Sequence, residues 1–259
     1  MSFGRGEVLE ICVEDAAGLA AAVAGGGGRV ELCSALALGG LTPPRSLVRL
    51  AAQAPIPVHM LCRPREGDFV YGPQETAQVC DDIDLAAEAG LAGIVIGAGA
   101  AGGLDLAVLG TWLDHARRAG TARGARLSLT LHRVFDVLDD MENGLEQAVA
   151  MGFDRILTSG GAVRAPEGVR MLAHLHELAA GRIVILAGSG VSAEAVPALR
   201  AAGIEEFHAS CRTPGTATTA SGRLEELGFQ KGNRPVTDAA EVSRLQAAIA
   251  RGQGGLNDT

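Results

Sequence analysis

Short apolar runs rich in Val, Ile and Leu recur at roughly 25- to 30-residue intervals along the chain, and longer alanine-rich runs separate them. This alternation is typical of repeated βα units, in which helices cover the strands of one parallel sheet. The runs expected to form strands are residues 8–12, 29–33, 57–63, 93–97, 127–133, 154–159, 182–188 and 206–211. Eight such units predict an α/β protein with the fold of a (βα)8 TIM-type barrel.

The alanine-rich runs stop where helices are expected to end. Gly90, Gly152 and Gly203 each follow one of these runs, at the position where a glycine commonly terminates a helix. Further along, residues 213–235 are rich in Gly, Thr and Ser, so we expect a C-terminal loop there. Residues 236–250 then show an amphipathic pattern, which predicts a final helix packed on the outside of the barrel.

Length and composition fit this architecture. The chain has 259 residues, the usual length of one such barrel, so residues 1–259 are expected to form a single domain. Hydrophobic residues make up 47% of the chain and aromatic residues only 3%, so the core must be aliphatic. The net charge of −8, without a cluster of Lys and Arg, argues against nucleic-acid binding. No leader pattern or membrane-spanning run is apparent, so we expect a cytoplasmic protein without membrane contact.

Polar residues alternate with apolar ones inside the expected strands. Because side chains i and i+2 share one face of a strand, Leu9 and Ile11 lie opposite Glu10. The apolar sets are expected to face the helices, and the polar sets to project into the closed interior. The inward set comprises Glu10, Cys12, Glu31, Cys33, His59, Arg63, His132 and His208. Since an isolated buried carboxylate costs several kcal/mol, these groups must pair or hold a ligand. We therefore predict a charged ligand site at the C-terminal mouth, with a buried ion-pair network as the alternative.

Loops that follow the third and fifth strands add charged residues to this mouth. Arg63 and Arg65 are expected to clamp an anion, with Asp68 in the same loop. A loop stabilised only by its own Arg–Asp pair is an equally good interpretation. Arg133 and Asp136 follow the fifth strand and place more charge on the same rim.

The seventh expected strand ends in a glycine-containing turn. Gly188 and Gly190 would let the backbone approach a ligand closely, and a helix follows directly. In barrels of this type the loops after strands seven and eight often hold phosphate. We therefore take both glycines as candidate ligand-binding positions, with a plain tight turn as the alternative.

Five irregularly spaced cysteines do not resemble a disulfide framework, and a reducing cytoplasm would keep them as thiols. Cys12 and Cys33 close the first two expected strands at matching positions, and neighbouring strands lie roughly 4.8 Å apart. Two thiolates select Cu(I) or zinc, so we expect Cys12 and Cys33 to share one soft metal ion. The alternative is two small apolar residues at strand ends. By alternation, Cys211 is expected on the outer face.

Several segments, taken together, resemble the CutC family of copper homeostasis proteins. The segments that carry the resemblance are residues 9–12, 29–33, 39–43, 63–69, 130–136 and 157–160. The resemblance implies a cytoplasmic TIM-type barrel, often a homo-oligomer such as a dimer, that is linked to copper handling. It places the following residues at family motif positions: Glu10, Glu31, His59, Arg63, Arg65, Asp68, His132, Arg133 and Asp136. Ser159, in the last segment, is added as a candidate ligand-binding residue. Glu66, Val134 and the glycine run 25–28 depart from the family pattern, but none of them replaces a charged residue.

Three functions are compatible with these features. The first is Cu(I) binding in copper homeostasis by Cys12 and Cys33, with help from neighbouring acids or His59. The second is a lyase, isomerase or hydrolase that acts on a small anionic or phosphorylated metabolite by Glu/His acid–base chemistry. Its candidate catalytic residues are Glu10, Glu31, His59, His132 and Asp136, and its candidate ligand-binding residues include His208. Schiff-base aldolase chemistry is excluded because the chain's single lysine, Lys231, lies outside the expected strands. The third is a non-catalytic interaction scaffold.

Overall fold

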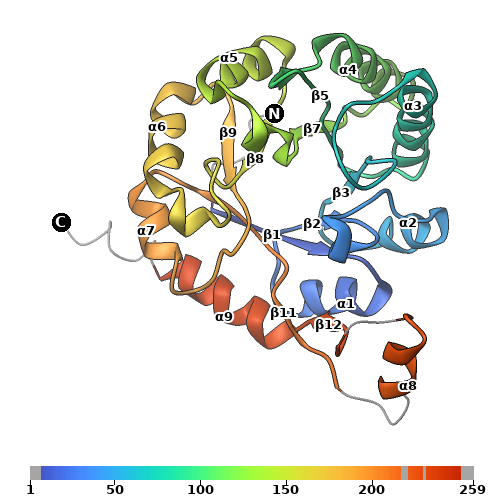
Figure 1. The fold of residues 1–259 in the computed structure, drawn as a ribbon, viewed down its shortest axis with the longest axis vertical. Helices are drawn as coiled ribbons and strands as arrows, with labels where there is room; N and C mark the ends of the chain where they lie inside the picture. Colours follow the sequence, from blue (N-terminus) through green and yellow to red (C-terminus); the bar gives the residue numbers. More distant parts are fainter. Residues whose placement is uncertain (1–6, 217–220, 230–231, 252–259) are drawn as a thin grey trace.

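Eight parallel strands close into a barrel at the centre of the structure (Figure 1). The computed structural model describes residues 7–216, 221–229 and 232–251. In barrel order the strands are β1 (Val8–Val13), β2 (Arg29–Leu32), β3 (Val58–Leu61), β4 (Gly93–Ile96), β7 (Ser128–Leu131), β8 (Arg155–Thr158), β9 (Val184–Ala187) and β10 (Glu206–Ala209). Strand β10 pairs with β1 and completes the ring. The predicted (βα)8 barrel is confirmed, and each expected strand overlaps one of these eight.

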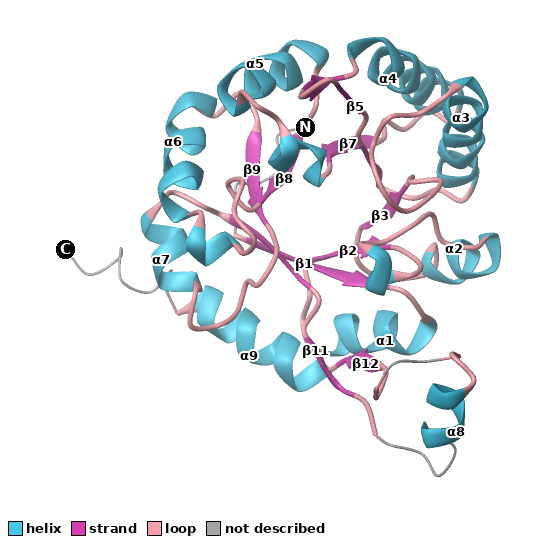
Figure 2. Cartoon of the chain, viewed as in Figure 1, coloured by secondary structure: helices cyan, strands magenta, loops and turns pink. Residues whose placement is uncertain are grey.

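Helices surround the barrel on its outside (Figure 2). They are α1 (Ala16–Ala24), α2 (Arg45–Ala51), α3 (Pro73–Glu88), α4 (Leu106–Ala122), α5 (Met141–Met151), α6 (Val169–Ala179), α7 (Val196–Ala201) and α9 (Ala239–Ala250). Side-chain caps fix several helix starts; Asp140, for example, accepts a hydrogen bond from the Asn143 amide. Gly152 ends α5 with φ of 82°, a conformation that favours glycine, as the sequence indicated. Among the helices described, none is long and apolar enough to cross a membrane.

Several short elements lie around the mouth of the barrel. They are the 3-10 turns η1 (Leu36–Leu38), η2 (Arg133–Val137) and η3 (Ala165–Glu167), and the small hairpin formed by β5 (Gly99–Ala100) and β6 (Gly103–Leu104). These elements lie in the loops that follow β2, β7, β8 and β4 respectively. They therefore supply the walls around the C-terminal ends of the strands.

Two apolar clusters of different size hold the fold together. The large cluster lies between strands and helices and includes Trp112, Phe135 and Phe207, all fully buried. The small one lies inside the barrel and contains Cys12, Cys33, Leu61 and Val95. An aliphatic filling of the interior is ordinary in this fold, whereas here polar groups occupy much of the interior beside this small cluster.

The C-terminal segment is more structured than the loop expected over residues 213–235. Strands β11 (Arg212–Pro214) and β12 (Pro235–Thr237) pair antiparallel, and α8 (Ser221–Glu226) lies between them along the chain. Residues 217–220 and 230–231, and Lys231 with them, lie outside the described residues. Helix α9 begins at Ala239 and not at residue 236, because Asp238 caps it by accepting from the Ala240 amide.

Candidate functional site

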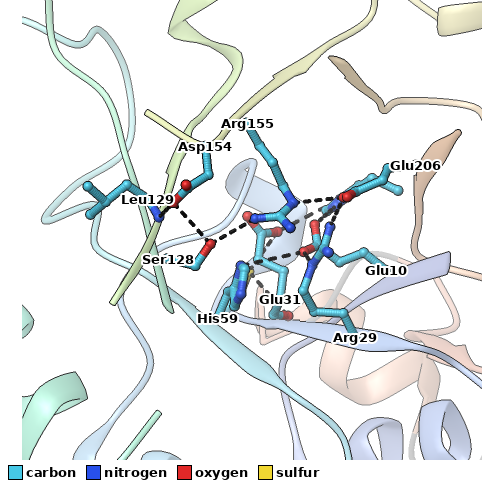
Figure 3. Close-up of polar contacts among 11 residues, drawn as sticks. Glu10, Arg29, Glu31, His59, Ser128, Leu129, Asp154, Arg155 and Glu206 are labelled. Atoms are coloured by element: carbon cyan, nitrogen blue, oxygen red, sulfur yellow. Dashed lines mark hydrogen bonds and ion pairs between the residues drawn. The ribbon is translucent and has the colours of Figure 1, made fainter. Parts of the chain in front are cut away.

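The interior face of the barrel carries a network of buried ion pairs (Figure 3). Arg29 lies between two carboxylates: its Nε is 2.5 Å from Glu10 Oε2, and its Nη2 is 2.6 Å from Glu206 Oε2. Arg155 Nε lies 2.8 Å from the same Glu206 oxygen, and Arg155 Nη1 donates to Ser128 Oγ. The buried acids are thus paired, as the alternation of the strands required.

Sequence analysis omitted Arg29, Arg155 and Glu206 from the inward set. Arg29 has the same parity as Glu31, and Glu206 has the same parity as His208, so the alternation itself contained the signal. Both residues stand at the first position of their strands. Arg29 is the cation that pairs directly with Glu10, and Glu206 shares that cation.

Glu10 connects this network to the mouth. His208 Nδ1 lies 2.8 Å from Glu10 Oε1 in hydrogen-bonding geometry, and the two residues pair in register across β1 and β10. Burial raises the pKa of Glu10, but Arg29 and His208 outweigh it and hold that pKa well below its usual value. For His208 burial lowers the pKa, while Cys12 and the bond to Glu10 raise it well above the ordinary value. Glu10 is therefore a carboxylate that orients a protonated imidazole.

Cys12, Glu31 and His208 form a group able to hold a metal ion. One ligand atom from each lies within 4.8 Å of those of the other two, and His208 Nε2 is 3.8 Å from Glu31 Oε2. Three protein ligands with space for a fourth are typical of zinc and copper centres. Because Nδ1 of His208 already bonds a carboxylate, Nε2 is the nitrogen left to face the ion, an arrangement common among metal-binding histidines.

Cys33 does not join this group. The register pairs Cys12 with Glu31, so the expectation that Cys12 and Cys33 occupy matching positions is wrong. Neighbouring strands of a closed barrel are staggered, and pattern alone does not give that stagger. Cys33 Sγ lies 3.3 Å from Glu31 Oε2 as a donor, and burial together with Glu31 raises the pKa of this thiol well above its usual value.

The other two interior histidines are neutral. Burial and the charge of Arg29 lower the pKa of His59 to about 3, and burial with Arg63 lowers that of His132 to about 3. His132 Nδ1 accepts a hydrogen bond from the Val134 amide, so its proton is on Nε2. Within the described part of the chain, neither residue belongs to the metal-binding group.

The two arginines of the expected anion clamp both bond to loop residues, although Arg63 also lines the cavity described below, and its buried Nε has no partner among the described residues. Arg63 donates to three backbone carbonyls, those of Leu38, Gly40 and Gly67. It thus ties the loops after β2 and β3 together. Arg65 pairs with Asp68 at 2.9 Å and with Glu75 at 2.5 Å, away from the residues that line the cavity described below.

Asp136 anchors the neighbouring loops. Its carboxylate accepts from Thr158 Oγ1, from the amides of Ser159 and Gly161, and from the guanidinium of Arg133. Arg133 also donates to Ser159 Oγ. This carboxylate has few lone pairs left for a ligand, so its evident role is to join the ends of β7 and β8.

A cavity of about 810 Å³ opens over the metal-binding group. Its wall is largely apolar and includes Leu36, Leu61, Phe69, Leu157 and Val191, with the neutral His132 among them. Charged residues line its rim: Arg133, Asp136, Arg212, Glu241 and Arg244. Gly190 lines it, whereas Gly188 lies against Leu157 and His208 behind the wall. Cys211 also lines the cavity, which corrects the outer placement that alternation indicated. The backbone turns to φ of 45° at Cys211, so the strand parity no longer applies there.

Comparison with known proteins agrees with this fold. The model of the CutC family matches residues 7–213. A protein of Rhizobium meliloti (strain 1021) described as family protein CutC is 48% identical over 244 residues, which cover 93% of this chain and 95% of that protein. A crystal structure from Streptococcus agalactiae, provisionally assigned to copper homeostasis as CutC, is 31% identical with a TM-score of 0.72, over 79% of this chain and 98% of that one. Thiamine phosphate pyrophosphorylase from Pyrococcus furiosus, 11% identical with a TM-score of 0.55 over 95% of this chain and 96% of its own, shows the shared barrel fold alone. The chain belongs to the CutC family.

Proposed function

We propose that this protein serves copper homeostasis in the cytoplasm by binding one Cu(I) ion at the mouth of its barrel. The observation that carries the proposal is the approach of the Cys12, Glu31 and His208 ligand atoms to within 4.8 Å of one another. Thiolate is the soft ligand that Cu(I) prefers, and imidazole is a good second ligand. The provisional link of the Streptococcus agalactiae relative to copper homeostasis supports the choice of metal.

In this proposal Cys12 Sγ and His208 Nε2 are the principal ligands, and the Glu31 carboxylate is the third. Binding requires an ionised Cys12 and a neutral imidazole, so His208 must release a proton as the ion arrives. Glu10 stays bonded to Nδ1 and fixes the direction of the ring. Cys33, which donates to Glu31, positions that carboxylate and does not bind the ion.

An anaerobic titration with Cu(I) against a competing chelator tests this site. Wild-type protein is expected to bind one ion per chain, and Cys12→Ser or His208→Gln to weaken binding by at least about tenfold. Cys80→Ser is the matched control, since this thiol lies on α3, remote from the ligand group. Unchanged affinity in Cys12→Ser would refute the proposal.

X-ray absorption of the copper-loaded protein separates the two thiol arrangements. The proposed site predicts one sulfur and at least one nitrogen in the first shell, and a spectrum unchanged by Cys33→Ser. Two sulfurs in the first shell would indicate instead that Cys12 and Cys33 share the copper ion. Light scattering during chromatography tests the further proposal, which rests on the family resemblance, that the protein is a homo-oligomer.

A further inference from the structure

The cavity over the metal-binding group is much larger than an ion requires. Its volume of about 810 Å³ lies within the range of roughly 300–1,000 Å³ that is usual for sites of small organic molecules. Cys12, Glu31 and His208 account for only one part of its lining. Much of the rest is apolar, including Leu61, Phe69 and Leu157. The space is therefore suited to an organic ligand.

Three residues on one wall of this cavity have backbone amides without an acceptor among the described residues. Gly190, Val191 and Ser192, in the loop after β9, all line the cavity. Among the described residues, their three amides donate to no hydrogen-bond acceptor. Gly190 and Val191 lie in the loop before α7, and Ser192 begins the turn that leads into that helix, because its carbonyl accepts from the Ala195 and Val196 amides. Successive unpaired amides of this kind are the usual cradle for a phosphate or a similar oxyanion.

Ser189 holds this loop against the loop that follows β8. Its carbonyl accepts from the Ala165 amide at 2.8 Å, and its hydroxyl donates to the Val163 carbonyl at 2.8 Å. Ser189 adopts φ of 75°, which is costly for a residue other than glycine. Val163 and Ala165, the partners in these two bonds, are the sequence neighbours of Arg164. The bonds therefore fix the backbone on both sides of Arg164.

Arg164 supplies a cation at the same place. Its side chain lies against Gly190, where a Cβ atom would collide with the guanidinium Nε, and Gly190 itself has φ of 67°. Arg164 is exposed and forms no hydrogen bond or ion pair with its side chain among the residues the structure describes. By contrast the rim residues Arg133, Arg212 and Arg244 are each paired with a carboxylate. Glu194, the carboxylate that follows in the same loop, is held by Arg244 at 3.1 Å.

We propose that the amides of Gly190, Val191 and Ser192, together with Arg164, bind the phosphate group of a small phosphate monoester whose organic part occupies the cavity. Three amides and one guanidinium suit a tetrahedral oxyanion, because charge-assisted bonds to it are stronger than neutral ones. The apolar wall suits the organic part. Glu31 and His208 line the same cavity, so the organic part would lie close to them.

Binding of glycerol 3-phosphate to metal-free protein in the presence of a chelator tests the site without involving copper. Calorimetry is expected to show one site per chain, weakened at least about tenfold in Arg164→Gln. Arg118→Gln is the matched control, because Arg118 is an exposed arginine on α4. Binding that is lost equally in both variants, or that is as strong for acetate, would overturn the proposal.

Amide chemical shifts of ¹⁵N-labelled protein locate the ligand directly. Glycerol 3-phosphate should move the signals of residues 190–192 in wild-type protein and also in Cys12→Ser, whose copper site is removed. Shifts confined to other residues, or none at ten-millimolar ligand, would refute the phosphate site. Loss of copper binding in Cys12→Ser with phosphate binding intact would keep the two proposals separate.

Discussion

Glu10 and His208 lie opposite each other on paired strands and are joined by a hydrogen bond of 2.8 Å between Oε1 and Nδ1. The other oxygen of Glu10 pairs with Arg29, which in turn pairs with Glu206. The imidazole at the mouth is thus held by a network that extends through the barrel interior (Figure 3). The interior charges of this protein serve the fold and the site together.

Glu10→Gln should weaken Cu(I) binding by about 10- to 100-fold, because loss of a carboxylate behind a metal-binding histidine has effects of this size. Competition with a Cu(I) chelator measures the change. Glu206→Gln is the matched control, since Glu206 pairs with Arg29 but does not touch His208. Both variants should lose stability, while only Glu10→Gln should lose copper affinity. Equal copper affinity in the two variants would contradict the role assigned to Glu10.

Arg29→Met should destabilise the protein by about 3–5 kcal/mol, because it removes the cation that two buried carboxylates share. The change leaves Glu206 with Arg155 and Glu10 with His208 alone. Urea unfolding measures the change in the free energy of unfolding. Arg45→Met provides the comparison, since Arg45 pairs with Glu88 on the surface and should contribute less than about 1 kcal/mol. A loss for Arg29→Met as small as that for Arg45→Met would show that the interior network does not stabilise the fold.

Much of this arrangement could be predicted from the sequence. The alternation of polar and apolar residues gave the inward direction of Glu10, Glu31 and His208, because a strand has a fixed period of two. The position of Cys12 opposite Glu31, and not opposite Cys33, could not be predicted, because the stagger depends on how all strands close the ring. Cys211 was misplaced for a different reason: its left-handed backbone breaks the alternation at the strand end.

Loop residues were the least predictable part. Anion binding by Arg63 stays a prediction. Its bonds to backbone carbonyls of two loops were not foreseen, because they depend on loop conformations that the pattern does not specify. The position of Arg164 beside Gly190 could not be predicted from the sequence, because it depends on the bonds that Ser189 makes between two loops. Short-range patterns specify strands and helices, whereas these contacts join segments distant in the sequence.

The free energy of unfolding should fall as the pH is lowered from about 6.5 to 5, because two buried histidines stay neutral in the folded state. The pKa values of His59 and His132 are lowered to about 3, below the unfolded value of 6.5. In this interval the unfolded state binds more protons than the folded state, so the free energy of unfolding decreases as the pH falls. The slope should approach about 1.4 kcal/mol per pH unit for each histidine. Urea unfolding at several pH values measures it.

His132→Gln should reduce this slope by about the contribution of one histidine. His174→Gln should leave it unchanged, because His174 lies on the surface of α6, paired with Glu142. His208 contributes little to the slope toward the acidic end of this interval, because its raised pKa keeps it charged in the folded state and an unfolded histidine is also mostly protonated below pH 6.5. An identical slope in wild type and His132→Gln would show that this imidazole already titrates normally in the folded protein.

Gly93→Ala and Gly110→Ala should change stability in opposite directions. A Cβ atom at Gly93, inside the barrel, would lie 2.6 Å from the Ser128 carbonyl oxygen and 2.8 Å from the His59 ring, so β4 must move away from its neighbours. Crowding of this kind typically costs about 1–3 kcal/mol. Gly110 lies within α4 with nothing near its Cβ position, so alanine there should stabilise the protein by about 0.5–1 kcal/mol. Thermal unfolding of the two variants measures both effects. A Gly93→Ala protein as stable as wild type would show that β4 can shift without loss, and that the close packing of the interior polar groups is not required.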